Sequence, residues 1–417
     1  MRNKEYEMRK LKTHLNFKRI ACCAILIVNC QLSIVNSAYA QVDSTKKLPS
    51  YKVAIFAPLY LDSVFGEKNE YKPKLGLPRF IMPAVDFVQG AQVALDSMRS
   101  VNENIQAHIY DSKAYEKNVP WLIQNHKLDS VNLIIGSIKD AEYKQLADFA
   151  WQKKIPFISA TYPNDGGITA NPYLVIMNPT LKSHCEAIYS YILQSHGTDK
   201  IYLCRKKGGQ EDQVASFIKA MNEQDGTPLL PITILNFDSD PSSDYLKTKL
   251  DSNRHSVIIG GSLEETFATS LANACSEMSP SYHITLLGMP TWDGFSAFHK
   301  KDTYVDFPIY FTTAYWNNKS DNYSSILQHA YTKKFKGKPS DMAYKGFETV
   351  YYFTKLMTKY PTDFASHLND RSLKIFNDYN FKPIELKKQE DNSLPDYFEN
   401  KHLYFVKMLN GSASKAW

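Results

Sequence analysis

Short apolar runs alternate with amphipathic stretches along most of this chain. Residues 133–135 form an apolar run that stops at Gly136-Ser137, and a stretch with helical spacing follows. A second run, residues 155–158, stops at Ser159-Ala160-Thr161. Runs of this length that are apolar throughout are typical of strands buried on both faces of a sheet. The alternation therefore predicts strand–helix–strand units of a parallel sheet.

The pattern occurs in two successive series, which predicts two doubly wound α/β lobes. In the first series the expected strands lie at 51–58, 105–111, 131–136, 155–159 and 173–179. In the second series they lie at 200–206, 231–237, 256–262, 282–290 and 306–316. Residues 324–335 and 345–359 have long helical patterns. The tail alternates at 372–386 and 402–409 as antiparallel strands do.

The first 40 residues have the composition of a secretory signal peptide. A basic leader precedes an apolar run at 20–28, and Ala38-Tyr39-Ala40 fits the small-residue pattern of a cleavage site. The run is shorter than the roughly 20 residues of a membrane span. A lipoprotein would be anchored at Cys30, but Asn29 is a poor residue directly before a lipidated Cys. Free export is favoured, with residues 41–50 as a linker.

Removal of that leader changes the charge of the protein. Of its 49 Lys and Arg and 43 Asp and Glu residues, seven basic and two acidic ones lie within residues 1–40, which leaves 42 and 41. A nearly neutral mature chain has no basic field that would attract nucleic acid. Three cysteines remain, Cys185, Cys204 and Cys275. Their wide spacing and apolar surroundings favour buried free thiols, with one disulfide and a spare thiol as the alternative.

Small hydroxyl-bearing residues at strand ends are the first candidates for a binding site. Ligands of open parallel sheets bind outside the carboxyl ends of the strands. Ser137, Ser159, Ala160 and Thr161 follow two neighbouring strands, where hydroxyls and free N–H groups suit a carboxylate or another small anion. Capping of the following helices is the alternative role for each residue alone.

The second series has comparable strand ends. Glu264 and Glu265 follow Gly260-Gly261-Ser262 and could accept a ligand ammonium, although acidic residues in a first helical turn also compensate the helix dipole. Trp292 and Asp293 follow the strand at 282–290. They would supply an aromatic wall and a polar contact, with core packing of Trp292 as the alternative.

Sequence motifs for catalysis are lacking. The chain has no G-x-S-x-G, Walker, H-E-x-x-H or G-x-G-x-x-G motif in the required context, and its 11 His residues do not cluster at metal-ligand spacings. We therefore expect a protein that is not an enzyme and has no cofactor or metal.

The order of these motifs resembles the type I periplasmic binding proteins, which include the branched-chain amino-acid receptors of ABC importers. The resemblance runs from about residue 51 to 316 and rests on "VAIFAPLY", "GAQVALDSM", "LIIGS", "IPFISA", "VIIGGS" and "HITLLGMP". It implies two lobes joined by three crossovers, expected near residues 178–180, 311–316 and 360–364. The N-terminal lobe would comprise 51–178 and 312–362, and the C-terminal lobe 179–311 and 363–417.

The resemblance also implies roles for the site residues. Ser137, Ser159, Ala160 and Thr161 would hold a ligand carboxylate, and Glu264 or Glu265 the ammonium. The implied function is an extracytoplasmic receptor that closes by a hinge on an amino acid or related carboxylate and delivers it to an ABC permease. The alternative is a ligand-sensing or cell-wall-associated regulatory scaffold of the same fold that contacts a protein partner.

Two departures from the family pattern bear on the ligand. Arg205, Lys206 and Lys207 stand where the family usually has an aromatic residue, and cationic groups there would suit an acidic ligand. The connection at residues 61–83 is longer than usual and is expected near the cleft as a lid.

Overall fold

The computed structural model describes residues 50–74, 76–99, 104–223, 226–386 and 394–416. The predicted signal peptide, Cys30 and residues 41–49 of the linker lie outside these residues. Tyr51–Trp417 forms one compact unit. None of the helices in the described ranges combines the length and apolar character that a membrane crossing needs.

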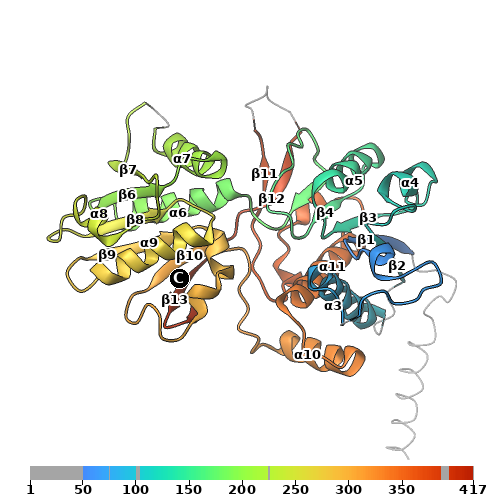
Figure 1. Cartoon of the computed structure of the whole chain (residues 1–417). Helices are drawn as coiled ribbons and strands as arrows, with labels where there is room; N and C mark the ends of the chain where they lie inside the picture. The colour runs from blue at the N-terminus through green and yellow to red at the C-terminus, as the bar shows by residue number, and fades with distance from the viewer. Residues whose placement is uncertain (1–49, 75, 100–103, 224–225, 387–393, 417) are drawn as a thin grey trace, which may run out of the picture. The chain divides into compact units, whose positions relative to one another are not determined.

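The first lobe is built on a seven-stranded sheet in the order β11-β12-β5-β4-β3-β1-β2 (Figure 1). Every neighbouring pair is parallel except β11 and β12, which are antiparallel. The strands are β1 (Tyr51–Ala57), β2 (Ile105–Asp111), β3 (Leu133–Gly136), β4 (Phe157–Ser159), β5 (Leu174–Ile176), β11 (Phe381–Ile384) and β12 (Tyr397–Asn400).

Helices cover both faces of this sheet, which explains why its inner strands β3, β4 and β5 are buried at every residue. Val53 and Ile55 of β1 pack in a core with helices α3 and α11, whereas Ala54 and Phe56 pack in a second core with α4 and α5. Successive strand residues thus face opposite cores. The helices of this lobe are α2 (Leu61–Val64), α3 (Met82–Arg99), α4 (Val119–Gln124), α5 (Asp140–Lys153), α10 (Asn322–Phe335) and α11 (Asp341–Lys359).

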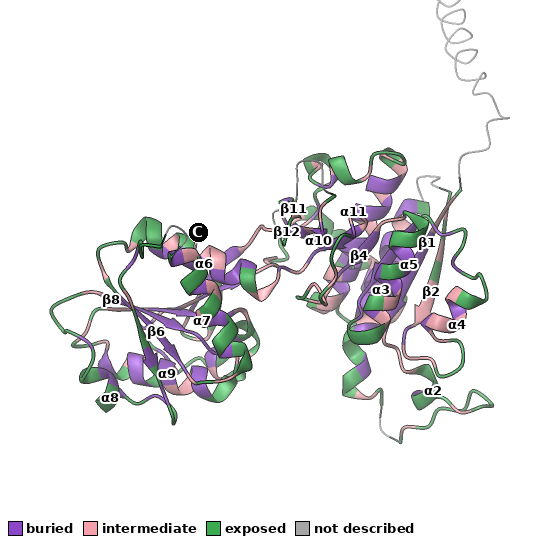
Figure 2. Cartoon of the chain, turned by 90° about the horizontal axis from the view of Figure 1, so that it is seen from above, coloured by how far each residue is buried: buried purple, intermediate pink, exposed green. Residues whose placement is uncertain are grey.

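The second lobe has the same plan, with strand order β14-β13-β10-β9-β8-β6-β7. Only the pairs β10–β13 and β13–β14 are antiparallel. Its inner strands β6 and β8 are buried (Figure 2), whereas the edge strand β14 is exposed. The elements are β6 (Lys200–Arg205), β7 (Ile232–Asn236), β8 (Ser256–Gly260), β9 (Ile284–Gly288), β10 (Ile309–Thr313), β13 (Tyr404–Leu409), β14 (Ser412–Lys415), α6 (Leu181–Ser195), α7 (Gly209–Asn222), α8 (Ser243–Lys247) and α9 (Glu265–Met278). The predicted α/β architecture of two doubly wound lobes is confirmed, with antiparallel strands added at one edge of each sheet.

The chain passes between the two sheets three times: after β5, after β10 and after β12. The first two crossings lie where the sequence predicts them. The third lies at residues 401–403 and not at 360–364, because β11 and β12 join the first sheet beside β5. The assignment of residues 363–417 to the second lobe is therefore corrected: among the described residues of this range, only the hairpin β13–β14 pairs in the second sheet.

Hydrogen bonds hold each of these crossings. Oε1 of Glu399 at the end of β12 accepts from the Thr180 N–H at 2.7 Å, and its other oxygen forms an ion pair with Lys401 at 3.2 Å. Asn377, held by Glu348, accepts from the N–H of Trp316 at 3.0 Å. The first and third crossings are thus bonded to each other through Glu399, and the second is bonded to the residues that precede β11.

The three described cysteines are free thiols in the core of the second lobe. Cys185, Cys204 and Cys275 have no exposed surface. Burial raises the pKa of the Cys185 thiol to about 12. The prediction of buried free thiols is confirmed.

Candidate functional site

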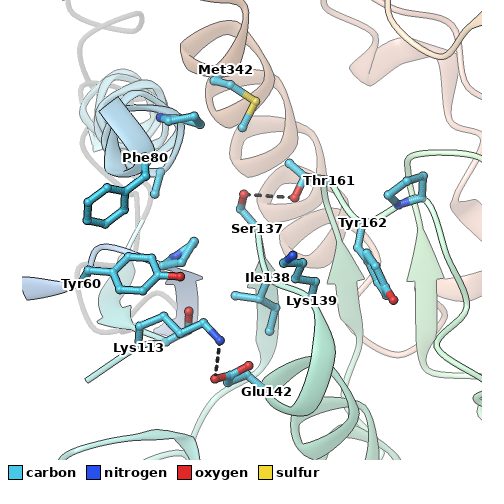
Figure 3. Close-up of a pocket in the computed structure, with 15 residues that line it drawn as sticks. Tyr60, Phe80, Lys113, Ser137, Ile138, Lys139, Glu142, Thr161, Tyr162 and Met342 are labelled. Atoms are coloured by element: carbon cyan, nitrogen blue, oxygen red, sulfur yellow. Dashed lines mark hydrogen bonds and ion pairs between the residues drawn. The ribbon is translucent and has the colours of Figure 1, made fainter. Parts of the chain in front are cut away.

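A cavity of about 290 Å³ lies at the carboxyl ends of β1, β2, β3 and β4 (Figure 3). Parallel pairing brings these ends together, since Gly136 of β3 lies opposite Ser159 of β4 and Phe56 of β1. Polar groups and apolar side chains share the lining, which consists of Pro58, Tyr60, Phe80, Pro83, Ala84, Ser112, Lys113, Ser137, Ile138, Lys139, Glu142, Thr161, Tyr162, Pro163 and Met342.

Two of the four residues predicted in this lobe line the cavity, and they touch. The hydroxyls of Ser137 and Thr161 lie 3.1 Å apart in a hydrogen bond. Gly136 allows this turn, because a Cβ there would stand 2.9 Å from both Ile138 and Phe157. Ser159 and Ala160 are buried and do not line this cavity. The structure thus brings Ser137 and Thr161 to the cavity, but not Ser159 and Ala160.

An aromatic wall stands across the cavity from these hydroxyls (Figure 3). The rings of Tyr60 and Phe80 meet edge to face, 5.3 Å between centroids. Tyr60 directly precedes the connection at residues 61–83 and Phe80 lies near its end, so both ends of the connection lie at this cavity. Tyr60 has a left-handed backbone, with φ at 51°. Strained backbones of non-glycine residues persist only where neighbours hold them.

Asp111, at the end of β2, holds the chain at Tyr60. Its carboxylate accepts the backbone N–H groups of Leu59, Tyr60 and Leu61 at 2.7–3.1 Å, and that of Lys113 at 2.9 Å. Charge-assisted bonds of this kind are about twice as strong as neutral ones. One carboxylate therefore fixes the path of the aromatic wall.

The charged side chains of the cavity are paired. Lys113 Nζ lies 2.8 Å from Glu142 Oε1, and Lys139 Nζ lies 3.7 Å from Asp140 Oδ2. Burial by itself would lower the pKa of Lys113, but the hydrogen bond and charge of Glu142 outweigh it and raise that pKa. Each ammonium thus has a carboxylate partner, and the polar groups that remain for a ligand are mainly hydroxyls.

Ser112 adds a third hydroxyl to the lining. Its Oγ is buried and has no hydrogen-bond partner among the described residues. A buried hydroxyl without a partner costs free energy, and a ligand oxygen would satisfy it.

The two glutamates predicted in the second lobe lie on its surface. Glu264 is the N-cap residue of α9, and Glu265 is in the first turn of that helix; both side chains are exposed. Ser262 between the strand and the helix is buried and donates to Glu211 at 2.7 Å. Neither Glu264 nor Glu265 lines the first-lobe cavity or the larger cavity that Asp293 lines.

The interpretation of Trp292 as a cavity wall is corrected. Its side chain has no exposed surface, and its Nε1 donates to the Ser262 carbonyl at 2.9 Å. A Cβ at Gly260 or Gly288 would stand within 2.5 Å of the indole, so these two glycines make the space that it fills. Trp292 is a core residue of the second lobe.

Asp293, the next residue, lines a larger cavity of about 1500 Å³. Thr291, Leu263 and Gln210 of the second lobe also line it, and so do Tyr162, Pro163 and Met342, which the smaller cavity shares. Among the acidic residues predicted in the second lobe, Asp293 alone reaches this lining.

The cationic patch expected at residues 205–207 is largely neutralised. Arg205 forms an ion pair with Asp212 and donates to the Glu211 carbonyl at 3.2 Å. Lys206 lies 2.7 Å from Asp240. The argument for an acidic ligand from these charges is therefore weaker than the sequence indicates.

Several lining residues have no signal in the sequence. Met342 comes from α11, some 200 residues beyond Ser137, and Lys113 and Glu142 belong to different strand–helix units. For Phe80, and for Tyr60 directly before the connection at residues 61–83, the only signal in the sequence is the length and position of that connection.

A family model described as periplasmic binding protein matches residues 87–377, more than half of the chain. The chain belongs to this family. Periplasmic binding proteins are extracytoplasmic solute-binding proteins and not enzymes. No curated protein matches the sequence.

Solved structures of other periplasmic binding proteins share the fold. A putative branched-chain amino acid ABC transporter protein from Rhodospirillum rubrum aligns with a TM-score of 0.62 and 11% identity, over 88% of this chain and 100% of that one. A branched-chain amino acid ABC transporter periplasmic ligand-binding protein from Burkholderia xenovorans gives 0.56 and 12%, over 88% and 93%. An ABC transporter substrate-binding protein from Desulfitobacterium hafniense, in complex with Leu, gives 0.52 and 11%, over 88% and 100%.

Proposed function

We propose that this periplasmic binding protein is an exported receptor for an amino acid or a related small carboxylate, which it delivers to an ABC permease. The observation that supports the proposal most directly is the first-lobe cavity, in which the Ser137 and Thr161 hydroxyls face the rings of Tyr60 and Phe80. The cavity volume, about 290 Å³, is at the lower end of the range for small-molecule sites, about 300–1,000 Å³.

The lining suits a ligand with one polar and one apolar end. A carboxylate would replace the mutual hydrogen bond of Ser137 and Thr161 and accept from both hydroxyls, with Ser112 as a further donor. The apolar end would lie against the aromatic wall and Met342. Because Lys113 and Lys139 already have acidic partners, a ligand with one carboxylate fits this lining better than a dicarboxylate.

The second lobe would complete the site when the hinge closes. Asp293 is the acidic group that we propose for the ligand ammonium, because it lines the larger cavity. Glu264 and Glu265 are exposed and remain the other candidates. The three crossings, bonded to Glu399 and Asn377, would act as the hinge, since a ligand that contacts both lobes favours their closed arrangement.

The test is ligand binding by the chain without its predicted leader, residues 41–417, which contains the whole compact unit. The protein is unfolded and refolded to remove carried-over ligand. Thermal shifts are then measured with amino acids, dipeptides, dicarboxylates and cell-wall fragments. A ligand at a hundredfold excess over its dissociation constant raises the free energy of unfolding by about 2.7 kcal/mol.

Thr161→Val removes the hydroxyl and keeps the shape of the side chain. A hydrogen bond to a charged ligand contributes about 1.5–3 kcal/mol, so we expect affinity to fall by about 10- to 100-fold. Thr332→Val is the matched control, since Thr332 lies on α10 and does not line the cavity. Equal losses in both variants, or an undiminished affinity of Thr161→Val, would refute the assignment.

An exposed apolar segment supports the regulatory scaffold as a second candidate. Among the described residues of the range 61–82, six large apolar side chains are 37–62% exposed. Apolar patches of this kind are typical of protein-binding surfaces. A well-folded protein that shows no thermal shift with any ligand class would favour this alternative. The six residues are Leu61, Phe65, Tyr71, Leu77, Phe80 and Met82.

A further inference from the structure

Two histidines share one carboxylate oxygen at the amino-terminal edge of the second sheet. Oδ2 of Asp199 lies 2.8 Å from Nδ1 of His196 and 2.7 Å from Nδ1 of His255. These side chains are partly exposed, with 14% of His196, 23% of Asp199 and 32% of His255 accessible. In the described part of the chain, they form the one group of three side chains with ligand atoms close enough for a metal ion.

The fold brings the three residues together from distant positions in the sequence. His196 is the C-cap residue of α6, and Asp199 directly precedes β6. His255 directly precedes β8, the parallel neighbour of β6, and Lys200 pairs with Ser256 in register. Asp199 and His255 are thereby adjacent at the amino ends of their strands. The proposed solute site lies at carboxyl strand ends, so this cluster is separate from it.

The outer ring nitrogen of each histidine has a hydroxyl partner. Nε2 of His196 lies 3.0 Å from Tyr191 Oη, and Nε2 of His255 lies 3.0 Å from Thr285 Oγ1. A hydroxyl can both accept and donate. It can therefore accept the Nε2–H of an imidazole whose Nδ1 binds a metal. Metal-binding histidines almost always have such a partner, which fixes the tautomer and the orientation of the ring.

We propose that His196, Asp199 and His255 bind a first-row divalent transition metal, with Zn²⁺ as the reference ion. Two imidazoles and one carboxylate suit such ions, whereas Ca²⁺ and Mg²⁺ prefer oxygen ligands. Ligand atoms about 2.0–2.2 Å from Zn²⁺ stand about 3.3 Å apart in a tetrahedral site. The two Nδ1–Oδ2 separations need to widen by only about half an ångström to meet this geometry. Water completes the coordination on the exposed side.

The test is calorimetric titration of tag-free, chelator-treated protein, residues 41–417, with ZnCl₂. We expect saturable binding of one ion per chain. His255→Ala is expected to weaken it by more than 100-fold, because two ligands remain. Tyr191→Phe removes only the outer partner of His196 and is expected to weaken it by about 10- to 100-fold. This second variant keeps all three ligands and tests the proposal even where His255→Ala fails to fold.

The chain contains a matched control pair. His126 and Asp129 have the same spacing as His196 and Asp199 and the same Nδ1–Oδ2 distance, 2.8 Å, but no third ligand of this kind accompanies them among the described residues. His126→Ala is expected to leave Zn²⁺ binding unchanged. The proposal is overturned if no equimolar binding is found, if binding survives in His255→Ala, or if His126→Ala abolishes it. The cluster would then only fasten the end of α6 to the sheet.

Discussion

Replacing Gly90 by Ala tests how the first lobe positions its cavity. Gly90 lies on α3 where this helix meets α11, and a Cβ there would stand 1.9 Å from the Ala343 carbonyl oxygen. The contact is reciprocal, because a Cβ at Gly346 of α11 would stand 2.0 Å from the Phe87 carbonyl oxygen. Real Cβ atoms do not approach closer than 3.0 Å, so the helices have to separate by about an ångström.

The expected cost follows from two opposing effects. Alanine favours a helix interior over glycine by about 1 kcal/mol. Overpacking of a core costs about 1–3 kcal/mol, and the upper end applies here because the obstacle is backbone, which cannot rotate away. We therefore expect the free energy of unfolding to fall by about 2 kcal/mol. Ala84 of α3 and Met342 of α11 line the cavity, so ligand affinity is expected to fall as well.

The assay is urea unfolding followed by circular dichroism, with Gly209→Ala as the control. Gly209 is the first residue of α7, and nothing lies within 4 Å of a Cβ there. The control is expected to unfold at the wild-type urea concentration or slightly above it. A Gly90→Ala protein as stable as its control would show that α3 and α11 do not pack as closely as the structure has them.

Two further predictions concern the second lobe. Burial lowers the pKa of His184 to about 3, against about 6.5 in an unfolded chain. The unfolded state then binds the extra proton between these values, so stability falls as the pH drops through this window, by up to about 1.4 kcal/mol per pH unit. His184→Asn is expected to flatten the urea midpoint plotted against pH, and an unchanged slope would contradict the assignment. Trp292→Ala is expected to cost about 3–5 kcal/mol of stability, measured by circular dichroism. Normal stability combined with lost ligand affinity would instead indicate that Trp292 binds the ligand.

The local pattern of apolar and polar residues predicts most of the fold. Buried strands of a doubly wound sheet are apolar on both faces, and the helices between them expose one face, so the alternation marks both kinds of element before any contact is known. The ends of β3 at Gly136 and of β4 at Ser159 could be predicted from the sequence for the same reason. Residues that reach the cavity from other units, such as Met342 and Lys113, carry no local mark, because their neighbours come from distant parts of the chain.

The tail shows where local pattern stops being sufficient. The alternation at 372–386 and 402–409 predicts antiparallel strands, and the structure contains the hairpins β11–β12 and β13–β14. One strand of each hairpin, β11 or β13, lies within these stretches, yet β12 pairs with β5 in the first sheet and β13 with β10 in the second. Each sheet has an open edge that accepts a strand, so the choice depends on which edge the chain can reach.

The sequence by itself thus determined the type and order of the elements, because burial of apolar side chains acts on neighbouring positions. Tertiary structure decided which strands pair, and with them which side chains meet. Trp292 is a core residue only because Gly260 and Gly288 leave space for it. His196, Asp199 and His255 form a cluster only because the register of β6 and β8 places residues 199 and 255 side by side. Such contacts join residues far apart in the chain, and no periodicity of the sequence records them.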